Sequence, residues 1–369
     1  MILVVETFDK QRKPMNAIQT SWVLLFILLS SSIVAQENKY QRFYTTENEE
    51  IPLHSITKIF INNQYGDINF TGWDKDSIAI NVSVWVEAPN QKIADEVLNQ
   101  ISIINQTSTG TINYKTVFTD NFFSNYSFGI NYILFAPHDL KLELHNRFGN
   151  INLHQFGSEL ITEVEYGNLV SKQQSGPIIS GKLSAMNGDL SVENIQNAKI
   201  VHKNGDLSIL QADRTSFLLD FSKGTIEIGN YLEINAKTSY TSLKKAQEIT
   251  ANLSTSTLII NELSQGKFIE SSAKSKVEIK KLMPYEKEIT FINKNSNLDL
   301  GISKKLSYNL YGELTNGQLR HYQTDSIKRI RDSNTTSFSG NFEFEGVSPA
   351  SLIIFGENGE INIYQSEKE

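Results

Sequence analysis

Hydrophobic and polar residues alternate along most of the chain, which is the pattern of β-strands with one buried face. Over residues 78–86 every second residue is Ile or Val, and similar alternation occurs near residues 59–70 and 140–144. Ile, Leu, Val, Phe and Tyr supply most of the apolar side chains, and these residue types favour strands. Alanine is sparse. The chain is therefore expected to be an all-β protein and not a helical bundle.

One segment has a helical pattern instead. Asn90 follows Pro89 and can cap a helix by accepting a hydrogen bond from the first turn. The apolar residues that follow recur at helical spacing, and they are Ile93, Ala94, Val97, Leu98 and Ile101. We therefore expect one α-helix near residues 91–104. It either covers the N-terminal end of the β structure or docks a partner.

A short unit recurs along the chain. It consists of an aromatic residue or Asn, then Gly, then Asn or Asp, then a short alternating strand. Clear copies are Tyr65-Gly66-Asp67, Phe148-Gly149-Asn150, Tyr166-Gly167-Asn168, Asn187-Gly188-Asp189, Asn204-Gly205-Asp206 and Asn358-Gly359-Glu360. Aligning the Gly position adds copies at Gly224, Thr241, Ser256, Ser275, Ser296 and Gly317. From Gly149 to Gly317 the mean spacing is about 19 residues, a length that suits one turn of a β-helix.

Such a unit cannot bury its apolar residues alone, but stacking it on its neighbours builds a continuous core. The sequence therefore predicts a parallel β-helix-like solenoid of about ten turns, capped by the one N-terminal α-helix. Because a corner between strands needs a positive φ angle, Gly, Asn and Asp are expected there. The predicted corner residues are Gly66, Asp67, Gly149, Asn150, Gly167, Asn168, Gly188, Asp189, Gly205, Asp206 and Gly224. Calcium binding by Asp67, Asp189 and Asp206 is the alternative, although they lack the acid-rich spacing of a calcium loop.

These patterns divide the chain into six segments. Residues 1–35 are expected to be a signal peptide, 36–55 an irregular N-terminal segment, and 56–147 an N-terminal β region that contains the helix. Residues 148–322 are expected to form the solenoid, 323–337 a polar loop, and 338–369 C-terminal strands. The basic run Lys328-Arg329-Ile330-Arg331 falls in the polar loop and is expected to be solvated.

The N-terminal segment has the features of an export signal. Residues 22–33 are apolar, which is shorter than the roughly 20 residues that a membrane-spanning helix needs. Small residues and Ala35 follow, so we expect cleavage after Ala35, with translation beginning at Met1 or Met15. An uncleaved membrane anchor is the alternative. After cleavage no second long apolar segment remains, and we expect an exported protein of the periplasm or cell surface without a transmembrane anchor.

Composition excludes several kinds of chemistry. The chain contains no cysteine, which excludes disulfides, thiolate metal sites and cysteine nucleophiles. Its net charge of −7 disfavours nucleic-acid binding, which needs a basic surface. The six histidines show no metal-binding spacing, and no phosphate-binding loop or nucleophile elbow occurs. We therefore expect no cofactor, no metal and no catalytic residues.

Two groups of side chains were weighed as functional candidates. Glu159, Glu163 and Glu165 cluster before Tyr166, and a glycosidase needs a pair of carboxylates at a fixed separation. Alternating Glu residues on a solvated strand face are the simpler interpretation. The second group lies in an aromatic, charge-poor segment, either as a loop over the core or as an exposed binding patch. Its candidate binding residues are Phe122, Phe123, Tyr126 and Phe128.

The order of these features resembles a known family. A signal peptide, a Tyr-Gly-Asp unit, one helix, a strand ending at Ala136-Pro137 and Gly-Asn/Asp repeats are together similar to the bacterial DUF4097-type β-strand-repeat family and related adhesin head domains of Bacteroidota. The resemblance covers about residues 55–300. It implies a right-handed stack in an exported protein, and it supplies no catalytic residues.

The sequence thus favours a non-enzymatic exported cell-envelope protein, adhesin-like or structural, that binds an envelope or extracellular ligand, protein or glycan, through its strand faces. Fold analogy is a weak basis for function. A carbohydrate-active β-helix enzyme, lyase or glycosidase, and a periplasmic component of envelope-stress signalling are the alternatives.

Overall fold

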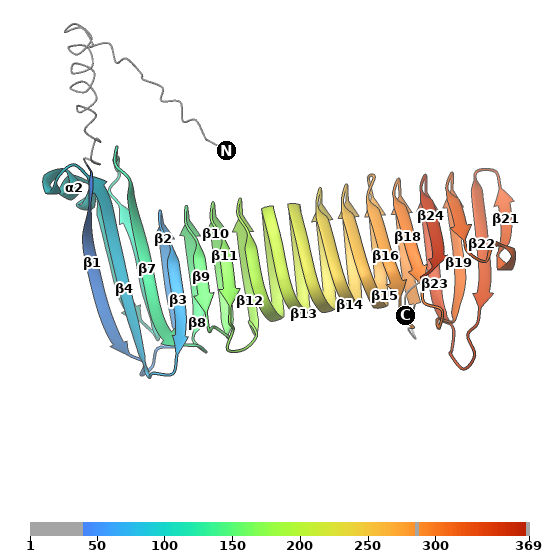
Figure 1. Ribbon diagram of the computed structural model, residues 1–369, viewed down its shortest axis with the longest axis horizontal. Coiled ribbons are helices and arrows are strands. Elements are labelled where there is room, and N and C mark those ends of the chain that lie inside the picture. The colour runs from blue at the N-terminus through green and yellow to red at the C-terminus, as the bar shows by residue number, and fades with distance from the viewer. Residues whose placement is uncertain (1–39, 285–287, 367–369) are drawn as a thin grey trace, which may run out of the picture.

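The computed structural model describes residues 40–284 and 288–366, which form nearly all β structure with a single α-helix. The strands join into one open sheet that follows the length of an elongated molecule (Figure 1). The predicted all-β class with a helix near its start is confirmed. The predicted signal peptide, residues 1–35, lies outside the described residues.

The strands form two long faces, which enclose one hydrophobic core. Face one contains, from the N-terminal end, β5 (Ile101–Ser108), β6 (Thr111–Phe118), β2 (Lys58–Gln64), β8 (Lys141–Arg147), β10 (Glu159–Glu165), β12 (Ser180–Met186), parts of β13 (Leu190–Lys237), β14 (Tyr240–Ser254) and β15 (Thr257–Ser272), then β17 (Glu288–Lys294), β23 (Ala350–Glu357), β19 (Tyr308–Thr315), β22 (Thr335–Phe342) and β21 (Lys328–Asp332). Face two contains β1 (Gln41–Pro52), β4 (Ser77–Ala88), β7 (Phe128–Pro137), β3 (Ile68–Trp73), β9 (Ile151–His154), β11 (Leu169–Lys172), the other parts of β13–β15, then β16 (Lys276–Leu282), β18 (Asn297–Ile302), β24 (Glu360–Gln365) and β20 (Gln318–His321).

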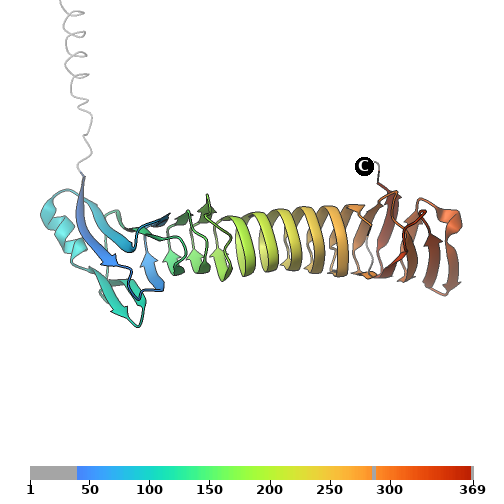
Figure 2. The ribbon, with the colours of Figure 1, turned by 90° about the horizontal axis from the view of Figure 1, so that it is seen from below.

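In the middle of the rod the strands are parallel, and β13 pairs with β14 at a constant offset. Gly224 pairs with Thr241, which pairs with Leu258 on the next strand of face two. Ile234 pairs with Ala251 on face one. Seen at right angles to Figure 1, these repeats follow one another along the rod (Figure 2). Each repeat therefore contributes one strand segment to each face.

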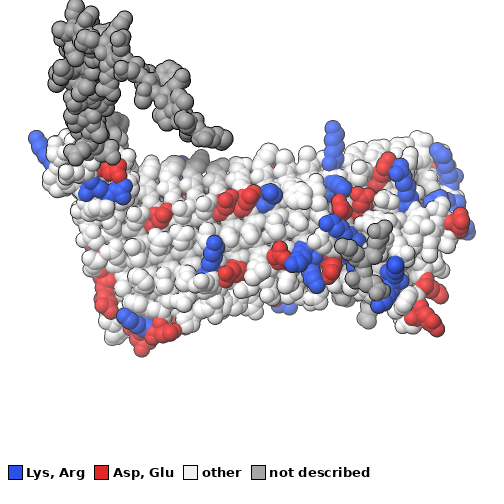
Figure 3. Space-filling view, in the orientation of Figure 1, with Lys and Arg blue, Asp and Glu red and all other residues white. Residues whose placement is uncertain are grey.

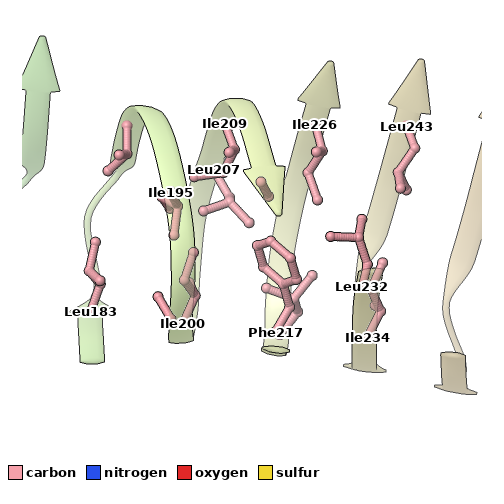
Figure 4. Packing of buried hydrophobic residues seen from close by; sticks show 14 of the residues in the cluster. Leu183, Ile195, Ile200, Leu207, Ile209, Phe217, Ile226, Leu232, Ile234 and Leu243 are labelled. Atoms are coloured by element: carbon pink, nitrogen blue, oxygen red, sulfur yellow. The ribbon is translucent and has the colours of Figure 1, made fainter. Parts of the chain in front are cut away.

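The core is built from the inward side chains of both faces. Ile209, Ile226 and Leu243 occupy equivalent positions on face two and are at most 1% exposed. Phe217 and Ile234 point toward them from face one (Figure 4). Burying one such side chain contributes about 1.5–3 kcal/mol, so the stack is stabilised repeat by repeat.

At the N-terminal end the chain leaves the repeating stack and forms additional elements, called the excursion below. After β3 the chain forms β4, the helix α2 (Gln91–Leu98), the β5–β6 hairpin and β7 before it returns to the stack at β8. β7 runs antiparallel to β4 and parallel to β3. The helix packs Ala94 and Val97 against Val86 and Ala88 of β4. The excursion thus covers this end of the core.

At the C-terminal end the order of strands in the sheet differs from their order in the chain. The last two strands, β23 and β24, lie between β17–β18 and β19–β20. The Nδ2 of Asn358 donates to Oδ1 of Asn295 at 3.0 Å, so the copy at Gly359 stacks on the copy at Ser296. The copy at Gly317 stacks on the copy at Gly359, one repeat closer to the C-terminal end of the rod. The final strands of the sequence are therefore interior members of the sheet.

Three local predictions are wrong. The helix ends at Leu98 and not near residue 104, because residues 101–104, three of which are isoleucine, join the β5–β6 hairpin. Residues 41–52 form β1, where irregular structure was predicted. Residues 323–337 were predicted to be a polar loop, but they contain the 3-10 helix η1 (Thr324–Ser326), β21 and the start of β22. Every residue of β21 is exposed, and on β1 only Phe43 and Ile51 are partly buried, so neither strand shows apolar alternation.

Candidate binding surfaces

The predicted corner residues form a hydrogen-bond ladder. The side-chain Oδ1 of Asp67 accepts from the backbone N–H of Asn150 at 2.8 Å, and Oδ1 of Asn150 accepts from Asn168 at 2.9 Å. The same bond joins Asn168 to Asp189 at 2.8 Å and Asp189 to Asp206 at 2.9 Å. These side chains therefore satisfy the backbone of the next repeat. Across the described residues, no group of three or more His, Cys, Asp or Glu side chains is placed to hold a metal ion.

The corner glycines are required by space and not by a positive φ angle, which corrects the prediction. The positive φ lies one residue earlier, at Phe148 (59°) and Tyr166 (55°). A Cβ on Gly167 would lie 1.9 Å from the carbonyl oxygen of Gly149, and one on Gly149 would lie 2.0 Å from that of Gly66. Only Gly lets the backbones of successive corners approach this closely.

Gly224 is not a corner residue, although the sequence alignment placed it there. The positive φ of its repeat is at Phe221, and Ser222 follows it. Gly224 itself pairs with Thr241 on face two, and a Cβ there would meet nothing closer than 3.6 Å. From Ser222 to Ser296 the corner glycine is therefore replaced by serine, and it returns at Gly317 and Gly359.

Three aromatic residues with positive φ stack on one another at the corner of the early repeats. Tyr65 and Phe148 have ring centroids 5.0 Å apart, and Phe148 and Tyr166 5.1 Å apart, with nearly parallel planes. Non-glycine residues with positive φ cost about 1–3 kcal/mol, and each aromatic pair returns about 0.5–1.5 kcal/mol. Phe148 is covered on both ring faces, and Tyr166 ends the stack and is 51% exposed, so the stacking joins successive corners.

The predicted aromatic patch is largely a packing element. Phe122, Tyr126 and Phe128 pack against the small core under helix α2. Phe128 also lies 5.2 Å from the ring of Tyr65, which joins this cluster to the corner stack. Only Phe123 is strongly exposed, at 68%. The structure thus brings three of the four candidates together, but it turns them toward the core.

A groove on the outer side of face one is a better-formed candidate. It has a volume of about 510 Å³ and crosses consecutive repeats of β13–β15. It is lined by Leu218, Leu219, Asp220, Asn235, Ala236, Lys237, Asn252, Leu253, Ser254, Glu270 and Ser272. The Nδ2 of Asn252 donates to Oδ1 of Asn235 at 3.0 Å, and Leu218 is 48% exposed. The groove therefore offers amides and hydroxyls beside apolar surface.

Sequence reasoning missed this groove, although a signal for it exists. Leu218, Asn235 and Asn252 are spaced by the same interval as Ser222, Ser239 and Ser256. Aligning Thr241 with Ser256, which are 15 residues apart and not 17, hid this regularity. Alignment on the serines would have placed the three lining residues in one column.

The glutamates considered for catalysis form ion pairs with the preceding repeat. Glu159 pairs with Lys141 at 2.8 Å, and Glu165 pairs with Arg147 at 3.2 Å. Glu163 lies 3.2 Å from His145, whose other ring nitrogen lies 3.2 Å from Glu143. Burial acts to raise the pKa of Glu143, but hydrogen bonds from Lys58 and His145 outweigh it and lower that pKa. These residues therefore form an ionic network on face one.

Two histidines are buried. His202 contacts the Ser222 hydroxyl at 2.8 Å and the Gly188 carbonyl at 3.1 Å, and burial lowers its pKa. His321 is 5% exposed, and its Nδ1 accepts from the Gln323 backbone N–H at 3.0 Å. Burial lowers the pKa of His321 to about 4. Both rings are therefore neutral at pH 7 and part of the packing.

We expect His321 to make stability depend on pH. Its folded-state pKa of about 4 lies below the unfolded value of about 6.5, so the unfolded chain binds the proton more tightly. Stability is complete above pH 6.5 and falls as pH decreases from there toward 4. Urea unfolding at pH 7.5, 6.5 and 5.5 measures this slope.

The matched variants are His321→Phe and His154→Gln, since His154 is exposed. His321→Phe should reduce the slope between pH 6.5 and 5.5, with the remainder coming from His202, whose pKa is also lowered by burial, and His154→Gln should leave the slope as it is in the wild type. Equal slopes in the wild type and His321→Phe would show that His321 is not responsible.

Comparisons with known proteins give no family assignment. No family model matches the chain, and a search of curated proteins finds no match. The DUF4097-type assignment is therefore not shown. Within residues 40–284 and 288–366, no helix has the length and apolar character needed to cross a membrane.

Solved structures with some similarity include three bacterial proteins. A "putative adhesin" from Parabacteroides distasonis is 10% identical, with a TM-score of 0.31, and the match covers 86% of this chain and 97% of that one. A "putative cell adhesion protein" from Clostridium sporogenes is 10% identical, with a TM-score of 0.20, covering 88% and 100%. A "Putative lipid binding protein" from Parabacteroides distasonis is 11% identical, with a TM-score of 0.31, covering 86% and 96%. Likenesses at this level do not establish a shared fold or function.

Proposed function

We propose that the protein is a non-enzymatic, exported cell-envelope protein of adhesin-like or structural type that binds its ligand in the groove on face one. The observation that carries this proposal is the groove itself, with a volume of about 510 Å³. Ligand sites in proteins are typically concave, about 300–1,000 Å³ in volume, and lined by apolar surface with a few polar groups. The groove has all three properties.

The proposed architecture is a right-handed parallel β-helix-like solenoid of about ten turns. The constant pairing offset between β13 and β14, which continues into β15 up to a register shift between Ile249 and Thr250, and the division of each repeat between two faces support it. In such a stack, equivalent side chains of successive repeats lie about 4.8 Å apart along the rod. The groove therefore suits an extended ligand, such as a glycan chain or a peptide segment, that crosses several repeats.

Export is part of the proposal and rests on the apolar run at residues 22–33 and Ala35. A signal peptide ending there places the mature protein in the periplasm or on the cell surface. The long, regular faces are compatible with a contact surface for an envelope or extracellular partner, protein or glycan.

The carbohydrate-active enzyme is the second candidate, because Asp220, Lys237 and Glu270 all line the groove. Their spacing argues against it. Glu270 pairs with Asn252, and Asn252 pairs with Asn235. The strand segment that carries Asp220 is one repeat before the segment of Asn235. Three strand spacings separate the two carboxylates by about 14 Å along the rod. Glycosidases need about 5–9.5 Å between their carboxyl groups.

The test is binding of the purified protein to a printed glycan array and to immobilised extracellular matrix proteins. We expect Asn252→Trp to reduce binding at least tenfold, because an indole in place of this exposed amide fills the groove. Ser242→Trp is the control, since Ser242 lies in the face-two part of the same strand, β14.

Each outcome is informative. Equal loss in both variants, or no loss in Asn252→Trp, would place binding elsewhere on the molecule. Absence of binding to any arrayed glycan or matrix protein would contradict the adhesin-like function. Release of shortened sugars from a bound polysaccharide, lost in Asp220→Asn, would establish the enzyme in place of the binding protein.

A further inference from the structure

The N-terminal end of the stack carries acidic side chains at positions that would face the core. Within the described residues, β1 pairs only with β4, so its outer edge is open. Glu47 and Glu49 lie opposite Val82 and Ile80, which are 1% and 2% exposed on the inner side of β4. Directly opposed residues lie on the same side of a sheet. The two glutamates therefore lie on the core side of β1, at the N-terminal end of the core.

Glu49 also connects the two faces at this end. Its carboxylate accepts hydrogen bonds from the Tyr114 hydroxyl on β6 and, at 3.2 Å, from Asn105 on β5. Burial and the bond to Glu49 raise the pKa of Tyr114. The N-terminal end is thus closed by carboxylates.

The C-terminal end has the opposite charge at the equivalent position. Within the described residues, β21 pairs only with β22. Arg329 lies opposite Phe338, which is 4% exposed on the inner side of β22, and Arg331 lies opposite Thr336 on the same side. Arg329 donates to the Leu319 carbonyl of β20 at 3.5 Å, so it also spans the two faces. The C-terminal end is thus closed by guanidinium groups.

We propose that copies of this chain associate head to tail, with the β21 end of one copy docked on the β1 end of the next. The charges at the two ends are complementary: Glu47 and Glu49 at one end, Arg329 and Arg331 at the other. The ends lie at opposite extremes of the rod (Figure 1), and on the face drawn in Figure 3 side chains of both signs are visible near each end, so the complementarity lies in the end strands themselves. The second copy is the partner that these ends fit.

The contact chemistry favours this pairing. Arg and carboxylate groups form bidentate hydrogen bonds, and open strand edges supply backbone donors and acceptors. Each end strand also exposes one large apolar side chain: Tyr44 is 58% exposed on β1 and Ile330 is 61% exposed on β21. A contact between two different surfaces of one chain leaves a free surface at each end of the assembly, and because the two surfaces lie at opposite ends of a rod, repeated contacts extend into filaments.

Inward charges on edge strands can instead serve to prevent association. The signs of the charges distinguish the two roles. Like charges at both ends would repel every end-to-end contact. Opposite charges repel only head-to-head and tail-to-tail contacts and attract in the head-to-tail one. The arrangement in this chain therefore selects one polarity of assembly.

The first test is sedimentation velocity of the purified protein over a range of concentrations. At about 50 mM salt we expect the average mass to rise with concentration above that of a single chain. At about 500 mM salt the association should weaken about tenfold, because the ions screen the charges at the junction. A single-chain mass at every concentration in low salt would overturn the proposal.

The second test uses charge reversal at the two ends. Glu50 is a third glutamate of β1, opposite Ala79 on the outer side of the strand. Glu47→Arg combined with Glu50→Arg makes the β1 end basic, and Arg329→Glu combined with Arg331→Glu makes the β21 end acidic. Each double variant alone should stay a single chain, because both of its ends then carry the same sign. An equimolar mixture of the two variants should associate again, since every contact between one variant and the other joins ends of opposite charge.

Thermal unfolding of each double variant confirms that it remains folded. Glu49 is left unchanged because it bonds Tyr114 inside the chain. Association that persists in either variant alone, or a mixture that stays monomeric when the wild type associates, would assign the contact to other surfaces.

Discussion

Gly167→Ala is expected to be the most destabilising single-methyl substitution in the stack. The added Cβ would lie 1.9 Å from the carbonyl oxygen of Gly149 and 2.6 Å from its carbonyl carbon. Both atoms belong to the backbone of the preceding repeat, so no side-chain rotation relieves the contact. The repeats must separate locally, and this breaks the hydrogen bond from the Asn168 N–H to Asn150 Oδ1. We expect a loss of about 3 kcal/mol in the free energy of unfolding.

Gly224→Ala is the matched control. Gly224 also lies in the stack, but its nearest neighbour to a new Cβ is a Leu207 methyl at 3.6 Å, an ordinary contact distance. Ala at this site should change the free energy of unfolding by less than about 0.5 kcal/mol. Urea titrations of both variants make the comparison. If Gly167→Ala and Gly224→Ala unfold alike, close approach at the corner is not what selects glycine.

The two glycines also show what the sequence could and could not reveal. The repeat itself, the all-β class and the helix start at Asn90 follow from local patterns, and Asn90 does cap α2 through a bond to the Ile93 N–H at 3.1 Å. The reason for each glycine does not follow, because it depends on a backbone that is distant in sequence. At Gly224 a glycine without a corner role shifted the alignment away from Ser222.

The end strands were missed for a related reason. β1 and β21 have no buried side, so their sequences carry no alternation that would distinguish a strand from a loop. Their pairing partners β4 and β22 define them. The position of β24 between β18 and β20 is likewise set by contacts, since the copy at Gly359 comes last in the sequence.

The candidate site was predicted only in outline. Strand faces were expected to bind, and the groove lies on one of them, but the named aromatic residues pack inward. Phe122 and Phe128 fill the space beside α2, which no local pattern could indicate. The groove depends on the short side chains Asn235, Asn252 and Ser254 lying beside Leu218, and this juxtaposition exists only after the repeats stack.

Ser239→Ala is expected to be the most damaging loss of a single hydroxyl in the later repeats. In these repeats serines take over the corner. The backbone N–H of Ser222 donates to Oγ of Ser239 at 3.1 Å, and that hydroxyl donates to the Lys237 carbonyl at 2.8 Å. Ser222 and Ser239 are 4% and 5% exposed, so water does not replace the lost acceptor. An unsatisfied buried N–H costs about 1–3 kcal/mol, and we expect a loss of that size.

Two measurements separate this effect from a general loss of stability. Hydrogen exchange should show faster exchange of the Ser222 amide in Ser239→Ala than global destabilisation alone produces, because its acceptor is gone. Ser242→Ala, in the face-two part of the same strand and only partly buried, should lie within about 0.5 kcal/mol of the wild type. An unchanged Ser222 exchange rate in Ser239→Ala would mean that the N–H finds another acceptor and that the serine ladder does not hold the later corners together.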